Sequence, residues 1–349
     1  MRRLPIFLLV DVSESMAGDN LRQLQEGLER LVRSLRADPY ALETVFISVI
    51  AFAGKAKTLT PLVELYQFYA PRLPLGSGTS LGNAMAHLMD EMERTVQRST
   101  PEKKGDWRPV VYLLTDGKPT DDIEPAVRRW KRDFEQRSNL VAIGVGKHAS
   151  LSALQRFTDN VLSLDATTED DFKRFIDWIS QSVASQSRSV SMNQDAKISL
   201  AKVDDSIMEK IGQIAQATTV DEDFVIIAGK CQSTKLPYLM KFERIGQRFS
   251  TQELSVSADR YNLVGVFPAE KDYYELSDPR AIARTINTEA LIGAPGCPHC
   301  ANRFGLAMCG CGQIFCVSGV GEATCPGCNQ AVVMDDGDGE GFDISRARG

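Results

Sequence analysis

Short apolar runs alternate with amphipathic segments in the first half of the chain. Continuous apolar runs are typical of strands buried on both faces, and they predict five such strands and one antiparallel edge strand: Leu4–Val10, Val45–Phe52, Val110–Leu114, Leu140–Gly144, Val161–Leu164 and the edge strand Lys57–Val63. Apolar residues at helical spacing predict helices within Leu21–Leu35, Leu81–Met92, Ile123–Phe134 and Phe172–Val183. This alternation favours an α/β fold, a doubly wound and mostly parallel sheet with helices on both faces.

The pattern changes after residue 185, where the predicted α/β domain (residues 1–185) ends. Residues 186–198 are polar, serine-rich and without apolar periodicity, which predicts a linker. Strand patterns at Phe224–Ala228, Leu236–Phe242 and Tyr261–Phe267, with few helices between them, predict a small β-rich module over residues 199–292. We expect a cysteine-rich, zinc-ribbon-like segment at 293–334 and a flexible acidic tail at 335–349.

Composition limits the classes of partner. Hydrophobic residues make up 43% and charged residues 25% of the 349 residues, which is normal for a globular protein. The net charge of -6 argues against a nucleic-acid or membrane-surface protein, because both need an excess of basic residues. No apolar run reaches the roughly 20 residues of a membrane span, and the amino-terminal run lacks a signal-peptide cleavage site. We therefore expect a cytoplasmic protein without a membrane partner.

Three polar segments lie after predicted strands or before a predicted helix, at the edge of the sheet where ligands bind in such folds. Asp11, Ser13 and Ser15 come directly after the first strand, Thr79 precedes the second helix, and Asp116 follows the strand that ends at residue 114. A doubly wound topology brings the carboxyl ends of its strands to one edge. Two carboxylates and three hydroxyls are hard oxygen donors, suited to Mg²⁺ or to Mn²⁺ or Ca²⁺, with a water position that a partner's carboxylate can take.

Aspartate and serine also serve as turn and helix-cap residues, so a single DxSxS motif is weak evidence for a metal site. The three segments together, in this order, favour the metal site. They resemble the signature of the von Willebrand factor A family, whose metal-ion-dependent adhesion site binds ligands without catalysis. The resemblance implies that Ser13 and Ser15 bind the ion directly, and that Asp11, Thr79 and Asp116 bind it directly or through water.

Seven of the eight cysteines fall between residues 297 and 328, with spacings that favour metal binding. The knuckles Cys297-Pro-His-Cys300 and Cys325-Pro-Gly-Cys328 can together supply a tetrahedral Zn²⁺ site. A redox CxxC pair is a weaker interpretation, because such a motif normally follows a strand in a βαβ unit. The remaining cysteines leave two alternatives: they form a second site with His299, or they replace one knuckle in a single site; these residues are Cys309, Cys311 and Cys316.

Cys231 stands apart from the cysteine-rich segment, and we expect it to be a small buried hydrophobic residue.

The full arrangement resembles the TerY-like proteins of bacterial tellurium-resistance and stress-response systems. Its elements are the adhesion-site motifs, the segment TDGKPTD at Thr115–Asp121, the β-rich module and the cysteine-rich end. The resemblance implies an association with a protein kinase and a PP2C-type phosphatase in a phosphorylation-based signalling module.

Three functions follow from these observations. The first is a non-enzymatic adaptor whose metal ion binds an Asp or Glu of a partner protein. The second is a nucleic-acid-associated factor that uses the zinc ribbon, but residues 297–328 hold a single basic residue, Arg303, and phosphate binding needs several. The third is metal-assisted hydrolysis at Asp11 and Asp116, for which no neighbouring general base is evident. No P-loop, HExxH or GxSxG motif is present in the sequence.

Overall fold

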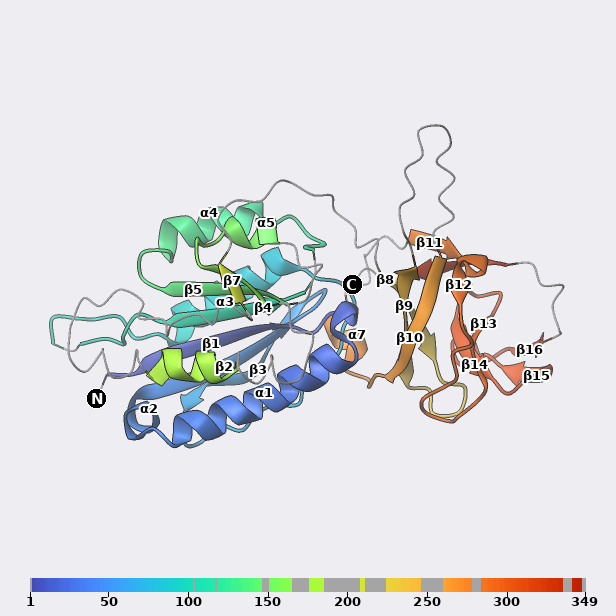
Figure 1. Ribbon diagram of the computed structural model, residues 1–349, viewed down its shortest axis with the longest axis horizontal. Coiled ribbons are helices and arrows are strands. Elements are labelled where there is room, and N and C mark those ends of the chain that lie inside the picture. Colours follow the sequence, from blue (N-terminus) through green and yellow to red (C-terminus); the bar gives the residue numbers. More distant parts are fainter. Residues whose placement is uncertain are drawn as a thin grey trace. The chain divides into compact units, whose positions relative to one another are not determined.

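The computed structural model describes two compact units (Figure 1). The described residues are 2–102, 104–116, 118–145, 151–164, 176–184, 208–210, 224–245, 260–277, 284–334 and 341–346. The first unit contains residues 1–12, 19–73 and 79–219, and the second contains 13–18, 74–78 and 220–349. Two short loops of the amino-terminal half, 13–18 and 74–78, therefore group with the carboxyl-terminal half of the chain.

A seven-stranded sheet in the order β3-β2-β1-β4-β5-β6-β7 forms the centre of the first unit. Its strands are β1 (Leu4–Asp11), β2 (Val45–Phe52), β3 (Ala56–Glu64), β4 (Val110–Thr115), β5 (Asn139–Val145), β6 (Val161–Leu164) and β7 (Met208–Lys210). The five central strands are parallel, and the edge strands β3 and β7 are antiparallel to their neighbours. All eight residues of β1 are buried, as the continuous apolar run predicts. The predicted α/β fold with a mostly parallel sheet is confirmed.

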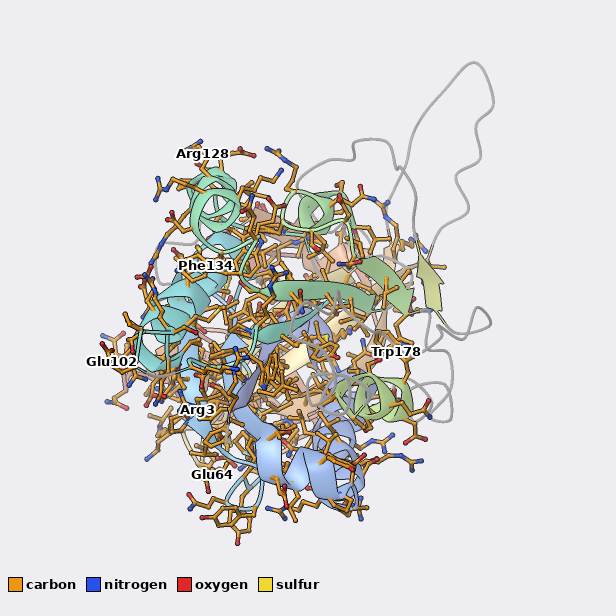
Figure 2. All side chains as sticks on the ribbon, turned by 90° about the vertical axis from the view of Figure 1, so that its left-hand side faces the viewer. Arg3, Glu64, Glu102, Arg128, Phe134 and Trp178 are labelled. Atoms are coloured by element: carbon orange, nitrogen blue, oxygen red, sulfur yellow. The ribbon has the colours of Figure 1, made fainter. Side chains whose placement is uncertain are left out.

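Helices cover both faces of this sheet, as the end-on view of Figure 2 shows. They are α1 (Asp19–Arg36), α2 (Pro39–Thr44), α3 (Leu81–Thr95), α4 (Glu124–Asp133), α5 (Leu151–Gln155) and a helical segment at 176–184. Helices α3 and α4 share one core with Phe7 and Leu9 of β1. On the other face, Arg30 of α1 donates to both carboxylate oxygens of Asp177 at 2.9 and 2.8 Å. None of the helices in the described part of the chain combines the length and apolarity needed to cross a membrane.

Asp38 and Pro39 lie between two helices, after the end of α1 and at the beginning of α2. The Asp38 carboxylate accepts hydrogen bonds from the backbone N–H groups of Tyr40 and Ala41, at 2.9 and 3.3 Å, and so caps α2. Proline suits the first turn of a helix because its missing N–H would have no intrahelical partner there. Sequence reasoning overlooked this short helix because the same two residues both end and begin helices.

The second unit contains a six-stranded sheet in the order β12-β10-β9-β8-β14-β13. Its strands are β8 (Phe224–Lys230), β9 (Pro237–Ile245), β10 (Arg260–Pro268), β12 (Leu291–Ile292), β13 (Phe304–Met308) and β14 (Ile314–Val317). The predicted separation of a β-rich module at 199–292 from a zinc-ribbon-like segment at 293–334 is wrong, because β8 pairs with β14 within one sheet. The predicted start of the module at residue 199 is also wrong, since β7 pairs with β6 in the first sheet.

Smaller elements complete the second unit. They are the short helix α7 (Tyr273–Leu276), the 3-10 helix η2 (Thr288–Ala290), the pair β11 (Arg284–Asn287) and β17 (Asp343–Arg346), and the pair β15 (Gly321–Thr324) and β16 (Ala331–Met334). Strand β17 corrects the prediction of a flexible tail over 335–349, because Ile344 is 1% exposed and packs in the core of this unit. The predicted linker at 186–198 and the first four residues of the helix predicted at 172–183 lie outside the described residues.

The hydroxyl of Tyr112 in β4 provides a test of the first core. It is fully buried without a hydrogen-bond partner among the described residues, and burial raises the pKa of this phenol. We expect Tyr112→Phe to leave the free energy of unfolding unchanged or to raise it by about 1 kcal/mol, because no hydrogen bond is lost. Denaturant unfolding of the purified protein measures this change.

The matched control is Ser48→Ala in the same sheet. The Ser48 hydroxyl is buried and donates to the carbonyl of Thr60 at 2.9 Å. Its removal should lower the free energy of unfolding by about 1 kcal/mol. A loss in Tyr112→Phe as large as the loss in Ser48→Ala would show that the phenol has a bonding partner.

Candidate metal centres

The pairing of β1 with β4 brings together the ends of two predicted metal-site segments. Val10 lies opposite Leu114 in the parallel register, so the next residues along each strand, Asp11 and Thr115, are neighbours. The Thr115 hydroxyl donates to the Asp11 carboxylate at 2.5 Å, and the Asp11 side chain is fully buried. Asp116 follows Thr115 directly and is partly exposed. The sheet therefore delivers both predicted carboxylates to the carboxyl ends of adjacent strands.

The two predicted serine ligands lie on a single 3-10 turn, η1 (Glu14–Met16), and its N-cap. The hydroxyl oxygens of Ser13 and Ser15 are 3.0 Å apart, and both residues are buried. Two neighbouring ligands of an octahedral Mg²⁺, each about 2.1 Å from the ion, stand about 3.0 Å apart. The spacing of these hydroxyls therefore fits one edge of such an octahedron.

Thr79 is fixed by a loop that follows β4. Its backbone N–H donates to the Thr120 hydroxyl at 3.0 Å, and its carbonyl accepts from the backbone N–H of Thr120 at 2.9 Å. These contacts use only the main chain of Thr79, whose side chain is 2% exposed. Three residues earlier along the chain, Gly76 forms a parallel bridge with Ser13. Short stretches of backbone thus connect the three predicted segments.

Asp121 holds the same loop against helix α3. Its two carboxylate oxygens accept from the backbone N–H groups of Gly82 and Asn83, at 3.1 and 2.8 Å. Burial raises the pKa of Asp121, and these two hydrogen bonds oppose that shift. Sequence reasoning did not assign a role to Thr115, Thr120 or Asp121, although all three belong to the TDGKPTD segment that extends beyond the metal-site motif. They are positioning residues for Asp11, Thr79 and α3.

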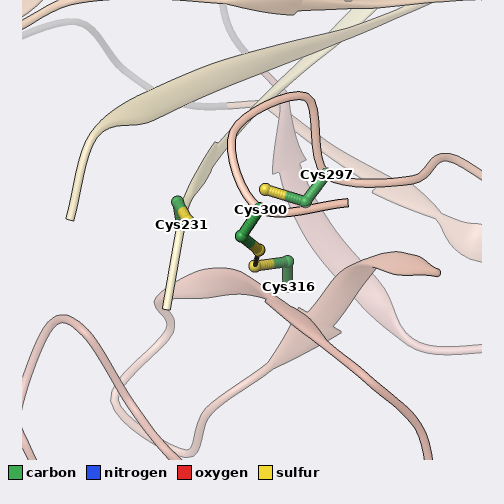
Figure 3. A group of neighbouring side chains, drawn as sticks. All are labelled: Cys231, Cys297, Cys300 and Cys316. Atoms are coloured by element: carbon green, nitrogen blue, oxygen red, sulfur yellow. Dashed lines mark hydrogen bonds between the residues drawn. The ribbon is translucent and has the colours of Figure 1, made fainter. Parts of the chain in front are cut away.

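The second unit carries two clusters of four cysteines (Figure 3 shows the first). In each cluster the sulfur atoms lie within 4.8 Å of one another. The first cluster contains Cys231, Cys297, Cys300 and Cys316, and the second contains Cys309, Cys311, Cys325 and Cys328. All eight cysteines of the protein therefore belong to one of the two clusters.

Sulfur–sulfur distances in both clusters fit a tetrahedral zinc ion. The Sγ atoms of Cys300 and Cys316 are 3.6 Å apart, and the Cys309–Cys328 and Cys311–Cys325 pairs are each 3.7 Å apart. Four thiolates about 2.3 Å from a tetrahedral Zn²⁺ stand about 3.8 Å from one another. Each cluster provides four protein ligands, the number that structural zinc sites use.

Cys231 opens a turn with the same geometry as the two CPxC knuckles. In all three turns the cysteine N–H donates to a carbonyl five residues later, and the cysteine carbonyl accepts from the N–H four residues later. The fourth residue after each cysteine has a positive φ: 62° at Lys235, 59° at Ala301 and 60° at Asn329. The turn after Cys231 is thus a knuckle in which Thr234 stands where the others have their second cysteine.

The structure corrects the predicted cysteine pairing. The two knuckles do not share a site: Cys297 and Cys300 group with Cys316, whereas Cys325 and Cys328 group with Cys309 and Cys311. His299 belongs to neither cluster, and its Nε2 lies 2.8 Å from the carbonyl of Pro237. Cys231 is buried, as predicted, but it is also a member of the first cluster, because β8 pairs with β14 beside Cys316.

Hydrogen bonds favour the thiolate form of one cysteine in each cluster, Cys231 in the first and Cys325 in the second. Burial opposes ionisation of Cys231, but hydrogen bonds from the side chain and backbone N–H of Thr234 outweigh it and lower the pKa of the Cys231 thiol to about 6. In the second cluster burial also opposes ionisation, and backbone N–H groups of the 325–328 knuckle lower the pKa of Cys325 to about 7. Burial raises the pKa of Cys316. A metal cation supplies the charge that four thiolates need, so its binding releases protons.

Two family profiles match this sequence. The profile of the von Willebrand factor type A domain matches residues 6–181, and that of the TerY-C metal binding domain matches residues 221–349. The first range extends from β1 into the helical segment at 176–184, and the second contains both cysteine clusters.

Similar proteins cover parts of the chain. Inter-alpha-trypsin inhibitor heavy chain H1 of Bos taurus is 24% identical over 155 residues, which are 43% of this chain and 17% of that protein. Proximal thread matrix protein 1 from the mussel byssus is 18% identical, with a TM-score of 0.40 over 52% of this chain and 48% of that one. A von Willebrand factor type A structure from Catenulispora acidiphila is 15% identical, with a TM-score of 0.42 over 52% of this chain and 43% of that one.

The cysteine grouping predicts two bound metal ions per chain. Cys231→Ser and Cys311→Ser should each reduce the metal content from two ions to one, because a serine hydroxyl is a poor replacement for a zinc-binding thiolate. Elemental analysis of reduced, freshly purified protein measures the content. Ser233→Ala, in the same turn as Cys231, is the matched control and should keep both ions. A content of two ions in Cys231→Ser would show that Cys231 is a buried hydrophobic residue and not a metal ligand.

Proposed function

The chain belongs to the von Willebrand factor type A family and ends in a TerY-C metal binding domain, and from this premise we propose that it is a non-enzymatic adaptor. In this proposal a divalent ion, held by Asp11, Ser13, Ser15, Thr79 and Asp116, binds an acidic residue of a partner protein. The observation that carries the proposal is the 3.0 Å spacing of the Ser13 and Ser15 hydroxyls on a buried turn that follows the buried Asp11.

The donor set explains why such an ion suits recognition. Mg²⁺ prefers oxygen ligands and retains water readily, so a carboxylate from another protein can complete its shell. The side chains of this chain neutralise part of the ion's charge and hold it at the ends of β1 and β4. Thr115, Thr120 and Asp121 supply the hydrogen bonds that fix the surrounding loops. The partner's negative charge provides the remaining electrostatic attraction.

Zn²⁺ in the two cysteine clusters has a structural role in this proposal. Four thiolates leave no open coordination position for chemistry. Most of the cysteines lie on loops, and the strands β13 and β14 between them are short, with five and four residues. Metal binding adds stability that such a small core cannot provide.

The physiological partners that we propose are a protein kinase and a PP2C-type phosphatase of a bacterial stress-response module that includes tellurium resistance. The TerY-C match supports this assignment because it agrees with the resemblance to TerY-like proteins, which implies an association with these enzymes. Recovery of tagged protein from a native bacterial lysate, compared between wild type and Thr79→Ala, tests it. Kinase and phosphatase should be recovered with the wild type and lost with the variant. Their equal recovery with both proteins would contradict a metal-dependent association.

Ion binding should stabilise the protein. Mg²⁺ at 100 times its dissociation constant should raise the free energy of unfolding by about 2.7 kcal/mol, provided that the unfolded chain does not bind it. Thermal unfolding with and without Mg²⁺ measures this, and Thr79→Ala should abolish the effect. This variant is informative because the contacts that fix Thr79 use its main chain and persist without the hydroxyl. Thr60→Ala on the edge strand β3 is the control and should respond like the wild type. A melting temperature indifferent to Mg²⁺ would exclude an ion at these residues.

Partner binding should require both the ion and an acidic side chain. Asp11→Ala and Thr79→Ala should each abolish partner binding while circular dichroism remains native. Substitution of the partner's critical Asp or Glu by Asn or Gln should weaken binding strongly, because the neutral amide loses the attraction to the ion. Mg²⁺ should be removed by dialysis, since a strong chelator also strips zinc from the cysteine clusters. Full affinity in folded Asp11→Ala would mean that the partner binds another surface.

A further inference from the structure

The loop between the two serines is engaged by side chains from the carboxyl-terminal half of the chain. Glu14 stands between Ser13 and Ser15, and its carboxylate is fully buried. It accepts hydrogen bonds from the hydroxyl of Tyr273 in α7 and from the hydroxyl of Ser77, the latter at 3.2 Å. Burial and the neighbouring Glu14 carboxylate raise the pKa of Tyr273 well above its usual value, so the phenol remains a donor.

Further contacts continue along the two loops of the second unit. The Ser277 hydroxyl accepts from the backbone N–H of Ser77 at 2.9 Å. Gly18 has a φ of +101°, and a Cβ atom there would lie 2.9 Å from the ring of Phe267 in β10. The loop thus ends at a residue whose lack of a side chain allows this aromatic ring to pack against it.

A buried cation is part of the same set of contacts. Lys241 of β9 is 7% exposed, and its ammonium group donates to the carbonyl oxygen of Ser15 at 2.5 Å. The ring centroid of Phe224 lies 4.6 Å from the same nitrogen. Burial of an ammonium group is costly unless hydrogen bonds and negative charge compensate it. Lys241 is therefore held at a residue whose hydroxyl belongs to the proposed ion-binding set.

We infer that the carboxyl-terminal module (residues 220–349) is an internal ligand of the adhesion-site loop (residues 13–18). In this arrangement Lys241 competes with the divalent ion and Tyr273 anchors Glu14. This inference rests on the proposed function, because it concerns access of the ion to Ser13 and Ser15. Lys241 holds the backbone carbonyl of Ser15 and the proposed ion its hydroxyl, so the two cations would lie close together, and their repulsion is strong where water is largely excluded. Binding of Mg²⁺ therefore loosens the Lys241 contact, and a partner gains access to the loop when the module releases it.

A supporting role for Lys241 would have the opposite sign. If the ammonium group only held the Ser15 carbonyl in place for the ion, its removal would weaken Mg²⁺ binding. The direction of the change in affinity therefore separates competition from support.

Calorimetric titration of full-length protein with Mg²⁺ tests the competition. Lys241→Met removes the charge and keeps most of the side-chain length, and we expect it to tighten Mg²⁺ binding roughly tenfold. Lys271→Met is the matched control because Lys271 is exposed two residues before Tyr273, and it should bind Mg²⁺ like the wild type. Zinc content and circular dichroism report whether each variant is folded.

The outcomes of this titration separate the two proposals. Equal or weaker Mg²⁺ binding in folded Lys241→Met, with wild-type binding that is lost in Asp11→Ala, would overturn the competition and leave the adhesion site intact. No Mg²⁺ binding in the wild type and in Lys241→Met would overturn both.

The contact itself can be detected without the ion. A photoreactive phenylalanine analogue in place of Tyr273 should cross-link to the tryptic peptide Leu4–Arg22, which contains Glu14. The same analogue in place of the exposed neighbour Tyr274 is the control and should give little of this product. Saturating Mg²⁺ should lower the yield at position 273 severalfold. Absence of the product, or a yield that Mg²⁺ leaves unchanged, would overturn the inference.

Discussion

Strand β1 is hydrogen-bonded on both sides, to β2 and to β4, and it is buried along its whole length. Only the ends of a strand in this position can reach solvent, so the chain leaves the sheet where the neighbouring parallel strands also end. The buried Asp11 carboxylate sits at that point, beside Thr115. A carboxylate in such surroundings requires donors or a cation. The Thr115 hydroxyl of the TDGKPTD segment supplies one such donor, and the ion that we propose would supply positive charge.

Sequence reasoning was accurate where one local pattern determines the structure. Continuous apolar runs predicted the central strands of the first sheet, and doubly wound topology predicted that Asp11 and Asp116 would lie at one edge of it; the structure adds that their strands, β1 and β4, are neighbours. It was inaccurate where the structure depends on pairing between distant segments. The β8–β14 pair joins residues about 85 positions apart and lies beside Cys231 and Cys316. The missing second cysteine after Cys231, replaced by Thr234, also hid the knuckle from a search for CxxC.

The two kinds of site differ in ligand chemistry, and this difference separates their ions. Thiolates are soft ligands that bind zinc strongly, whereas hydroxyls and carboxylates are hard ligands suited to magnesium. The first cysteine cluster lies in the core of the second unit, so an ion bound there would be part of that core, whereas Cys311 and Cys328 of the second cluster are exposed. The oxygen site lies on loops at the ends of strands, and its hard donors would hold magnesium together with water. In our proposal one chain therefore keeps zinc as a structural ion and binds magnesium according to its concentration.

The order of the cysteines along the chain has a consequence for biosynthesis. The first cluster draws on residues 231, 297, 300 and 316, and the second on 309, 311, 325 and 328, so the ligands of one cluster interrupt those of the other. During translation Cys316 emerges after half of the second cluster and completes the first, and the second becomes complete twelve residues later, at Cys328. A chain released by the ribosome before Cys316 completes neither cluster. Metal loading would thus distinguish a finished polypeptide from one truncated before Cys316, which would lack the stability that metal binding adds.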